Sequence, residues 1–371
     1  MSKNKLYSKI LQHLIFIVFL TINIFPVPAQ NTKEISVWTQ PLQKCWEVSL
    51  ENMSNLNIAS DNERLFIPLT NKIITLNASD GNIIWETEIK GLINGKLLLE
   101  NGLLLVSSEQ TDQKKSLLTI LDSKTGIPSK QINLESFPAS IQTVFNGNLI
   151  ISNSNSINAI NLNNEDLIFK SDTLNKIFFI SSPENSSIYL GSKNRTLIEL
   201  SLADGSILRQ FNINGYPAYI SHSRNFEQII IGYKDGTVNS FDNKLKKNWD
   251  LKFGGEITDI KNFKENLLIS SKDNFMYSVK AVKGNNIWKL KLPGRIVSSV
   301  LINQETLLIV SFGSESAILI NPQNGRMINK IDFEKDTYFV SQPVYINDKV
   351  IIPTNRGIKA FSQNCSEKGG I

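Results

Sequence analysis

The amino-acid sequence repeats a short pattern about every 40 residues. Each copy has an apolar stretch, a turn rich in Asn, Asp or Gly and, in several copies, a Trp; the clearest copy runs from Ile74 to Trp85. The equivalent positions further on are separated by 45, 39, 40, 40, 39 and 41 residues, and they are Lys130, Phe169, Arg209, Trp249, Trp288 and Asn329. A four-stranded propeller blade takes about 40–45 residues. We therefore predict an all-β fold consisting of a single β-propeller.

A second series of positions has the same period. Hairpin turns are expected at Asn155, Asn194, Asp235 and Asp273, which are 39, 41 and 38 residues apart. Asn, Asp and Gly are the residues that tight hairpins favour, because other residues are strained at positive φ. Since both series run in phase, they support the same blade repeat.

The two ends of the repeat predict how the ring closes. Residues 349–361 form a strand, a turn and a second strand, but no Trp strand follows them. Residues 44–50 supply such a strand, because Trp46-Glu47 matches Trp85-Glu86. We predict eight blades, the last completed by the N-terminal strand, which removes the open edge at the seam. A seven-bladed ring remains the alternative, because blades 3 and 7 have degenerate patterns.

The chain has two cysteines, and both fall at this seam. Cys45 precedes Trp46, and Cys365 occupies the place that Asp80 has in the first copy. We predict a Cys45–Cys365 disulfide, which would persist in an exported protein. The alternative is two unrelated buried thiols.

The N-terminus resembles a secretory signal. Lys3, Lys5 and Lys9 precede an apolar run over residues 14–25, and Ala29 ends a small-residue cleavage site. The expected organisation is a signal peptide (1–29), a linker (30–41), the propeller (42–366) and a tail (367–371). Twelve apolar residues are short for a membrane anchor, which is the alternative, and no Cys follows them for a lipid anchor. Removing the signal leaves 36 basic and 34 acidic residues without a basic cluster, so we expect no nucleic-acid partner.

The segment Leu76–Trp85 resembles the repeat of the PQQ-like β-propellers, roughly Leu-Asp-Ala-x-x-Gly-x-x-x-Trp, with weaker copies at 121–126, 202–205, 282–288 and 321–325. This family contains quinone-dependent dehydrogenases and non-enzymatic propellers similar to BamB of the outer-membrane protein assembly machine. The resemblance implies that the Gly forms the turn between the last two strands and that the Trp packs between blades. The residues to which these roles carry over are Trp46, Gly81, Trp85, Trp249, Gly284 and Trp288. Lys130, Arg209 and Asn329 depart from the pattern, so those junctions must pack differently.

The sequence does not favour an enzyme. The quinone dehydrogenases of this family have long insertions and adjacent cysteines beside the cofactor, and this chain has neither. His222 is the one histidine outside the predicted signal, and no nucleophile, phosphate or metal motif is present. We expect no catalytic residue, no bound metal and no cofactor, PQQ included. The alternative is a PQQ-binding oxidoreductase or a ligand-sensing propeller.

One face of the predicted ring is the candidate binding surface. The longest departure from the repeat, Ser107–Ser116, and a smaller one, Phe312–Ser316, lie in second–third strand hairpins on the same face as the blade links 212–217 and 253–256. Loops on a rigid ring are the usual place for binding. Tyr216, Phe253 and Phe312 are the candidate anchors, although the insertion could equally be a solvated hairpin. We expect an exported scaffold, monomeric within a larger complex, that binds protein partners in the cell envelope, as in outer-membrane protein assembly.

Overall fold

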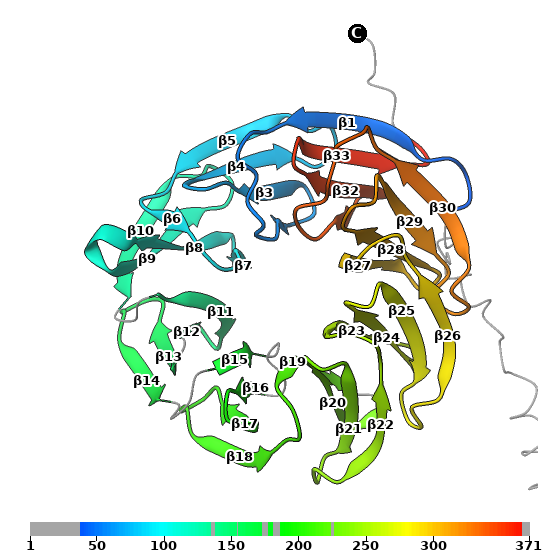
Figure 1. Cartoon of the computed structure of the whole chain (residues 1–371). Helices are drawn as coiled ribbons and strands as arrows, with labels where there is room; N and C mark the ends of the chain where they lie inside the picture. The colour runs from blue at the N-terminus through cyan, green and yellow to red at the C-terminus, as the bar shows by residue number, and fades with distance from the viewer. Residues whose placement is uncertain are drawn as a thin grey trace, which may run out of the picture. The chain divides into compact units, whose positions relative to one another are not determined.

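The fold is an eight-bladed β-propeller. A computed structural model describes residues 38–134, 138–153, 155–172, 177–180, 186–223 and 226–365; the predicted signal and tail lie outside these ranges. The strands form eight antiparallel sheets around a central axis, as Figure 1 shows. The helical element with defined bounds in these ranges is a 3₁₀ turn, η1 (Thr111–Gln113). The predicted all-β propeller is confirmed.

The blades follow one another along the chain. Blade 1 contains β2 (Ala59–Ser60), β3 (Arg64–Pro68), β4 (Lys72–Asn77) and β5 (Ile83–Glu88). Blade 2 contains β6 (Leu92–Ile93), β7 (Leu98–Glu100), β8 (Leu103–Gln110), β9 (Lys115–Asp122) and β10 (Pro128–Leu134). Blade 3 contains β11 (Ser140–Phe145), β12 (Asn148–Ser152), β13 (Ser156–Asn161) and β14 (Leu167–Asp172). Blade 4 contains β15 (Ile177–Ile180), β16 (Ser187–Ser192), β17 (Thr196–Ser201) and β18 (Ile207–Asn212).

The second half repeats this arrangement. Blade 5 contains β19 (Pro217–Ser223), β20 (Gln228–Tyr233), β21 (Thr237–Asp242) and β22 (Lys247–Lys252). Blade 6 contains β23 (Ile257–Phe263), β24 (Asn266–Ser271), β25 (Phe275–Lys280) and β26 (Asn286–Lys291). Blade 7 contains β27 (Ile296–Asn303), β28 (Thr306–Ser311), β29 (Ser316–Ile320) and β30 (Met327–Asp332). Blade 8 contains β31 (Val344–Ile346), β32 (Lys349–Thr354), β33 (Gly357–Ser362) and β1 (Gln43–Ser49).

Burial explains the two kinds of strand sequence. Middle strands such as β20 and β28 are buried along their whole length, because each blade has a neighbour on both faces. Outer strands such as β5 alternate between exposed and less exposed positions after their first two residues. The hydrophobic cores therefore lie between blades, and each combines side chains from two adjacent sheets.

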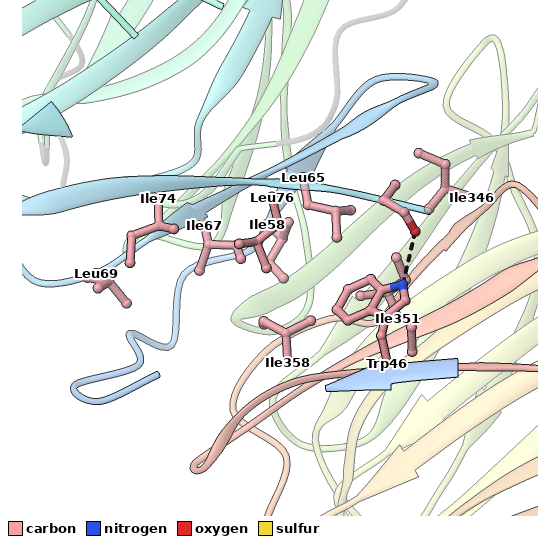
Figure 2. Close-up of a cluster of buried hydrophobic side chains, with 12 residues drawn as sticks. Trp46, Ile58, Leu65, Ile67, Leu69, Ile74, Leu76, Ile346, Ile351 and Ile358 are labelled. Atoms are coloured by element: carbon pink, nitrogen blue, oxygen red, sulfur yellow. Dashed lines mark hydrogen bonds between the residues drawn. The ribbon is translucent and has the colours of Figure 1, made fainter. Parts of the chain in front are cut away.

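The closing blade forms as predicted. β1 pairs antiparallel with β33, with Glu47 opposite Lys359, and the blue and red strands lie side by side in Figure 1. The structure has a disulfide between Cys45 and Cys365, whose Cα atoms are 5.2 Å apart. Figure 2 shows Trp46 reaching from β1 into the cluster that blade 8 shares with blade 1, including Ile351 and Leu65.

Each Trp of the repeat packs against the turn Gly of the following blade. A Cβ on Gly81 would lie 2.7 Å from the Trp46 ring, and Gly284 and Gly325 stand in the same relation to Trp249 and Trp288. The indole N–H donates to a carbonyl three residues before that Gly; these bonds are Trp46 to Ala78 (3.2 Å), Trp85 to Ser123 (3.2 Å), Trp249 to Ala281 (2.8 Å) and Trp288 to Pro322 (3.1 Å). The Trp and the Gly thus form one contact between two blades.

Two junctions without an aromatic residue also lack the Gly. Lys130 forms an ion pair with Glu165 of the next blade, 2.8 Å from Nζ to Oε1, and Glu165 occupies the Gly position with φ of 67°. Arg209 donates to the carbonyl of Asn243, and Leu245 occupies the Gly position with φ of 64°. Without an indole to accommodate, the turn tolerates a side chain. These junctions pack differently, as the sequence suggested.

At the third departure, Asn329, Trp38 supplies the aromatic side chain that the repeat lacks. Trp38 is buried in the cluster between blades 7 and 8, and the Asn329 amide donates to the carbonyls of Trp38 (3.0 Å) and Gln40 (2.6 Å). The segment before β1, expected to be a linker, therefore supplies the aromatic side chain that blade 7 lacks.

The Trp–Gly contact predicts a difference between two glycine substitutions. Gly284 and Gly147 have similar φ, 70° and 75°, but a Cβ meets Trp249 at 2.8 Å in the first case and no atom within 4 Å in the second. Gly147→Ala should lower the free energy of unfolding by about 1 kcal/mol, the cost of a left-handed residue. Gly284→Ala should lower it by about 3 kcal/mol, because overpacking is added. Urea unfolding of both variants measures the difference, and equal losses would contradict the contact.

Candidate functional site

The second–third hairpins and the blade links together form one face of the ring, here called the hairpin face. Tyr216, in the link before blade 5, is 41% exposed, and its ring lies 5.0 Å from the Arg195 guanidinium. Phe312, in the second–third hairpin of blade 7, is 65% exposed. Both therefore present aromatic surface on this face.

The expectation for Phe253 is wrong. This residue is only 9% exposed, and its ring packs against Tyr277 with centroids 4.3 Å apart. Phe253 lies four residues after Trp249, and the apolar residues at the equivalent places of other blades, Ile89, Ile213 and Leu292, are buried as well. Phe253 is thus a core residue between blades 5 and 6 and cannot contact a partner.

Two further apolar side chains lie on the hairpin face. Leu92 belongs to β6, beside the blade 2 hairpin, and Tyr338 belongs to the link between blades 7 and 8; both are about half exposed. The Tyr338 N–H donates to the Asn355 side chain at 2.9 Å, and the Phe312 N–H donates to the Arg295 carbonyl at 2.7 Å. Hydrogen bonds to neighbouring loops therefore fix the backbone at Tyr338 and Phe312 in the unbound protein.

The blade 2 insertion extends the strand ladder rather than forming an open loop. β8 and β9 stay paired up to Gln110 opposite Lys115, and η1 closes the hairpin. Beside it lies a hollow of about 360 Å³, lined by Gly91, Leu92 and residues 109–113. The insertion thus forms one side of a hollow that the exposed Leu92 side chain also lines.

The mouth of the central channel is polar. A cavity of about 310 Å³ is lined by Tyr219, Asp259, Lys261 and the loop residues around Asn57 and Ser341. Lys261 forms an ion pair with Asp259 at 2.5 Å, and burial together with the Asp259 charge raises the pKa of Tyr219. PQQ carries three carboxylates. Because the one cation lining this cavity is already paired with a carboxylate, the described lining does not fit that cofactor.

Neither a metal cluster nor a membrane-spanning helix is found in the ranges that the structure covers. No group of three or more His, Cys, Asp or Glu side chains could hold a metal ion there. No helix in those ranges is long and apolar enough to cross a bilayer. His222 lies on the inner strand β19, with its carbonyl accepting from Asn262 at 2.9 Å.

Comparison with known proteins agrees with this geometry. Residues 36–138 match a family model described as outer membrane protein assembly factor BamB. This stretch holds the closing strand and blades 1 and 2, and it confirms the resemblance to the PQQ-like repeat. No curated protein sequence matches the chain.

Solved structures share the fold at low identity. The crystal structure of BamB from Moraxella catarrhalis superposes with a TM-score of 0.64 at 16% identity, covering 89% of this chain and 99% of that one. The computationally designed Ika8 protein gives 0.72 at 10% identity (86% and 99% covered), and the C-terminal WD40 domain of Sif2 gives 0.70 at 9% (87% and 98%). Because unrelated functions occur on this architecture, these likenesses establish the fold alone.

Proposed function

We propose that this chain is an exported, non-catalytic scaffold whose hairpin face binds a protein partner in the cell envelope, in the manner of an outer-membrane protein assembly factor. The observation that carries the proposal is the pair of exposed aromatic side chains, Tyr216 and Phe312, on loops already fixed by hydrogen bonds. Aromatic residues are the side chains most enriched in binding hot spots. A pre-ordered loop loses little entropy when a partner docks.

The family match and the disulfide support the remaining parts of this proposal. The match over residues 36–138 is to an assembly factor rather than to an oxidoreductase. A disulfide persists in oxidising compartments, which favours export. If the signal is removed after Ala29, intact mass measurement of the protein from its native compartment should give a chain that begins at Gln30.

A crosslinking pull-down tests the hairpin face. The double variant Tyr216→Ala/Phe312→Ala should recover the partner of the wild-type protein much less efficiently, since loss of one hot spot of about 2 kcal/mol lowers affinity roughly 30-fold. The matched control is Ile207→Ala/Met327→Ala, which removes side chains of comparable exposure from the outer strands β18 and β30.

Thermal unfolding accompanies the pull-down, because both pairs are exposed and neither should change the melting temperature. Unchanged partner recovery by the folded Tyr216→Ala/Phe312→Ala variant would rule out this face. Equal losses with the Ile207→Ala/Met327→Ala control would show that recovery depends on general surface hydrophobicity.

A further inference from the structure

Each blade ends in an outer strand whose far edge makes no sheet pairing within the described chain. These strands are β1, β5, β10, β14, β18, β22, β26 and β30. An open edge presents unpaired N–H and C=O groups to any other strand. The two residues that lie one and three places after the Trp position point to the same side of the outer strand, because side chains alternate. The charges at these two positions determine which kind of strand can pair with each edge.

Most outer edges are neutral at these two positions, and on β1 the single charge, Glu47, is paired with Lys359, while Ser49 is uncharged. Lys170 pairs with Asp172 on β14, and Lys330 pairs with Asp332 on β30 at 2.6 Å. On β22, Asp250 and Lys252 each have a partner of opposite charge. The corresponding residues on β10 and β18 are uncharged, namely Gln131, Asn133, Gln210 and Asn212.

Two edges differ, and their charges are opposite. β26 carries Lys289 and Lys291, and neither ammonium has a carboxylate within ion-pair distance among the described residues. Lys289 instead lies 5.8 Å from the Phe275 ring. β5 carries Glu86 and Glu88 at the equivalent positions, and all four side chains are exposed.

We propose that β5 of one copy of this chain pairs antiparallel with β26 of a second copy. In the register that sets Glu86 opposite Lys291, Glu88 falls opposite Lys289, so both ion pairs form on one face of the joined sheet. Ile84 and Ile287 lie at the bulge just before the two charges of their strands, and both are more than 40% exposed in the single chain. Cross-strand pairs of opposite charge stabilise such a ladder, whereas like charges oppose it.

Glu86 already forms an ion pair within the single chain, and the proposed pairing must accommodate it. Lys72 donates to Glu86 at 2.8 Å, with both side chains partly exposed. A surface ion pair of this kind contributes little, and a carboxylate can accept from two ammonium groups. The contact is head-to-tail, because β5 and β26 belong to different blades. Association should therefore continue beyond two copies as concentration rises.

Charge reversal tests the pairing by sedimentation velocity of the full exported protein. The wild-type chain should associate with rising concentration at low salt and dissociate at about 1 M salt, where the screening length falls to about 3 Å. Lys289→Glu/Lys291→Glu and Glu86→Lys/Glu88→Lys should each remain monomeric, since both of their edges then carry the same sign. An equimolar mixture of the two variants should associate, and the fourfold variant should associate by itself.

The matched control is Gln210→Ser/Asn212→Ser on β18, which changes the equivalent positions of another edge without adding charge and should associate as the wild type does. A wild-type chain that stays monomeric at every concentration would overturn the proposal, as would association of the single-edge variants. The hairpin face is untouched by these substitutions, so failure here leaves the proposed partner binding standing. Far-UV circular dichroism confirms that every variant is folded.

Discussion

Loss of the Cys45–Cys365 disulfide should lower the free energy of unfolding by at most about 5 kcal/mol. The bond closes a loop of 320 residues, and the loop entropy that it removes from the unfolded chain grows with the logarithm of that length. For a domain of this size the loss corresponds to a fall of about 7 °C in melting temperature. The variant Cys45→Ser/Cys365→Ser should show this fall without any reductant.

Reductant supplies the control for this prediction. It should lower the melting temperature of the wild-type protein to that of the double Ser variant and leave the variant itself unchanged. β1 should then exchange its amide hydrogens faster than the other outer strands, because it has lost its one covalent link and is held only by non-covalent contacts, namely its pairing with β33, the Trp46 packing and the Glu47–Lys359 ion pair. Equal exchange in β1 and β14 would contradict a stapling role for the bond.

The fold followed from the sequence because a propeller repeats its local signals. The Trp positions recur at the blade interval, and Trp46 identified the missing strand of the last blade. The contact between each Trp and the turn Gly of the following blade did not follow from the sequence. It depends on the twist that brings the outer strand of one blade over that turn of the next. Lys130 and Arg209 departed from the repeat, and the groups of the next blade that they bind, the Glu165 carboxylate and the Asn243 carbonyl, became evident only in the fold.

The candidate site was less predictable for a related reason. A link between blades normally lies on the surface, so Phe253 was expected to be exposed like Tyr216. The two positions are not equivalent, because Phe253 lies four residues after a Trp position, where other blades bury Ile213 and Leu292, whereas Tyr216 lies seven residues after one. Trp38 precedes the first repeat and had no equivalent position to compare with. Trp38 thus lay outside the period, whereas the burial of Phe253 could have been predicted from its place in the repeat.

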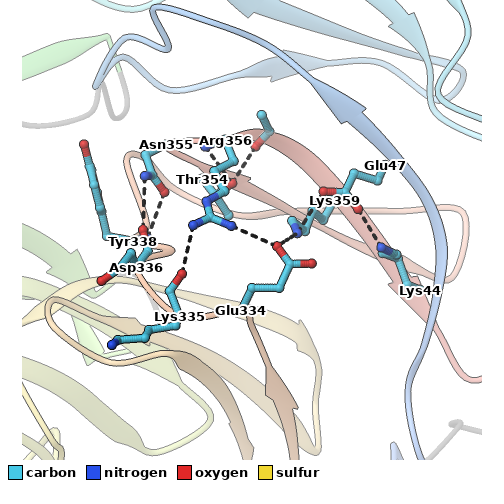
Figure 3. Close-up of polar contacts among 11 residues, drawn as sticks. Lys44, Glu47, Glu334, Lys335, Asp336, Tyr338, Thr354, Asn355, Arg356 and Lys359 are labelled. Carbon is cyan, nitrogen blue, oxygen red and sulfur yellow. Dashed lines mark hydrogen bonds and ion pairs between the residues drawn. The ribbon is translucent and has the colours of Figure 1, made fainter.

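A buried lysine at the seam should make two acidic residues essential for stability. The Lys359 side chain is 3% exposed, and its Nζ lies 2.8 Å from Glu47 on β1 and 3.2 Å from Glu334 in the link after β30. Figure 3 shows this network, in which Lys44 also contacts Glu47 and Arg356 contacts Glu334. Glu47→Gln/Glu334→Gln should lower the free energy of unfolding by about 3 kcal/mol, because a buried charge then lacks its partners.

Adding Lys359→Met to this double variant separates the charge from the packing. A buried ion pair replaced by apolar side chains of similar volume is often neutral for stability. The triple variant should therefore regain most of the loss in urea unfolding at neutral pH. A triple variant no more stable than the double would show that the carboxylates act through packing instead.

Acid should remove the contribution of Glu47 from the wild-type protein. Hydrogen bonds from Lys359 and then Lys44 hold the pKa of Glu47 below its usual value of 4.5. A carboxyl whose pKa is lower in the folded state stabilises the fold above its unfolded pKa, and this stabilisation disappears as the pH falls through the folded value. The difference in unfolding free energy between the wild type and Glu47→Gln should therefore be constant near neutrality and shrink below about pH 4.5. A difference that persists undiminished in acid would mean that Glu47 stabilises the seam without its charge.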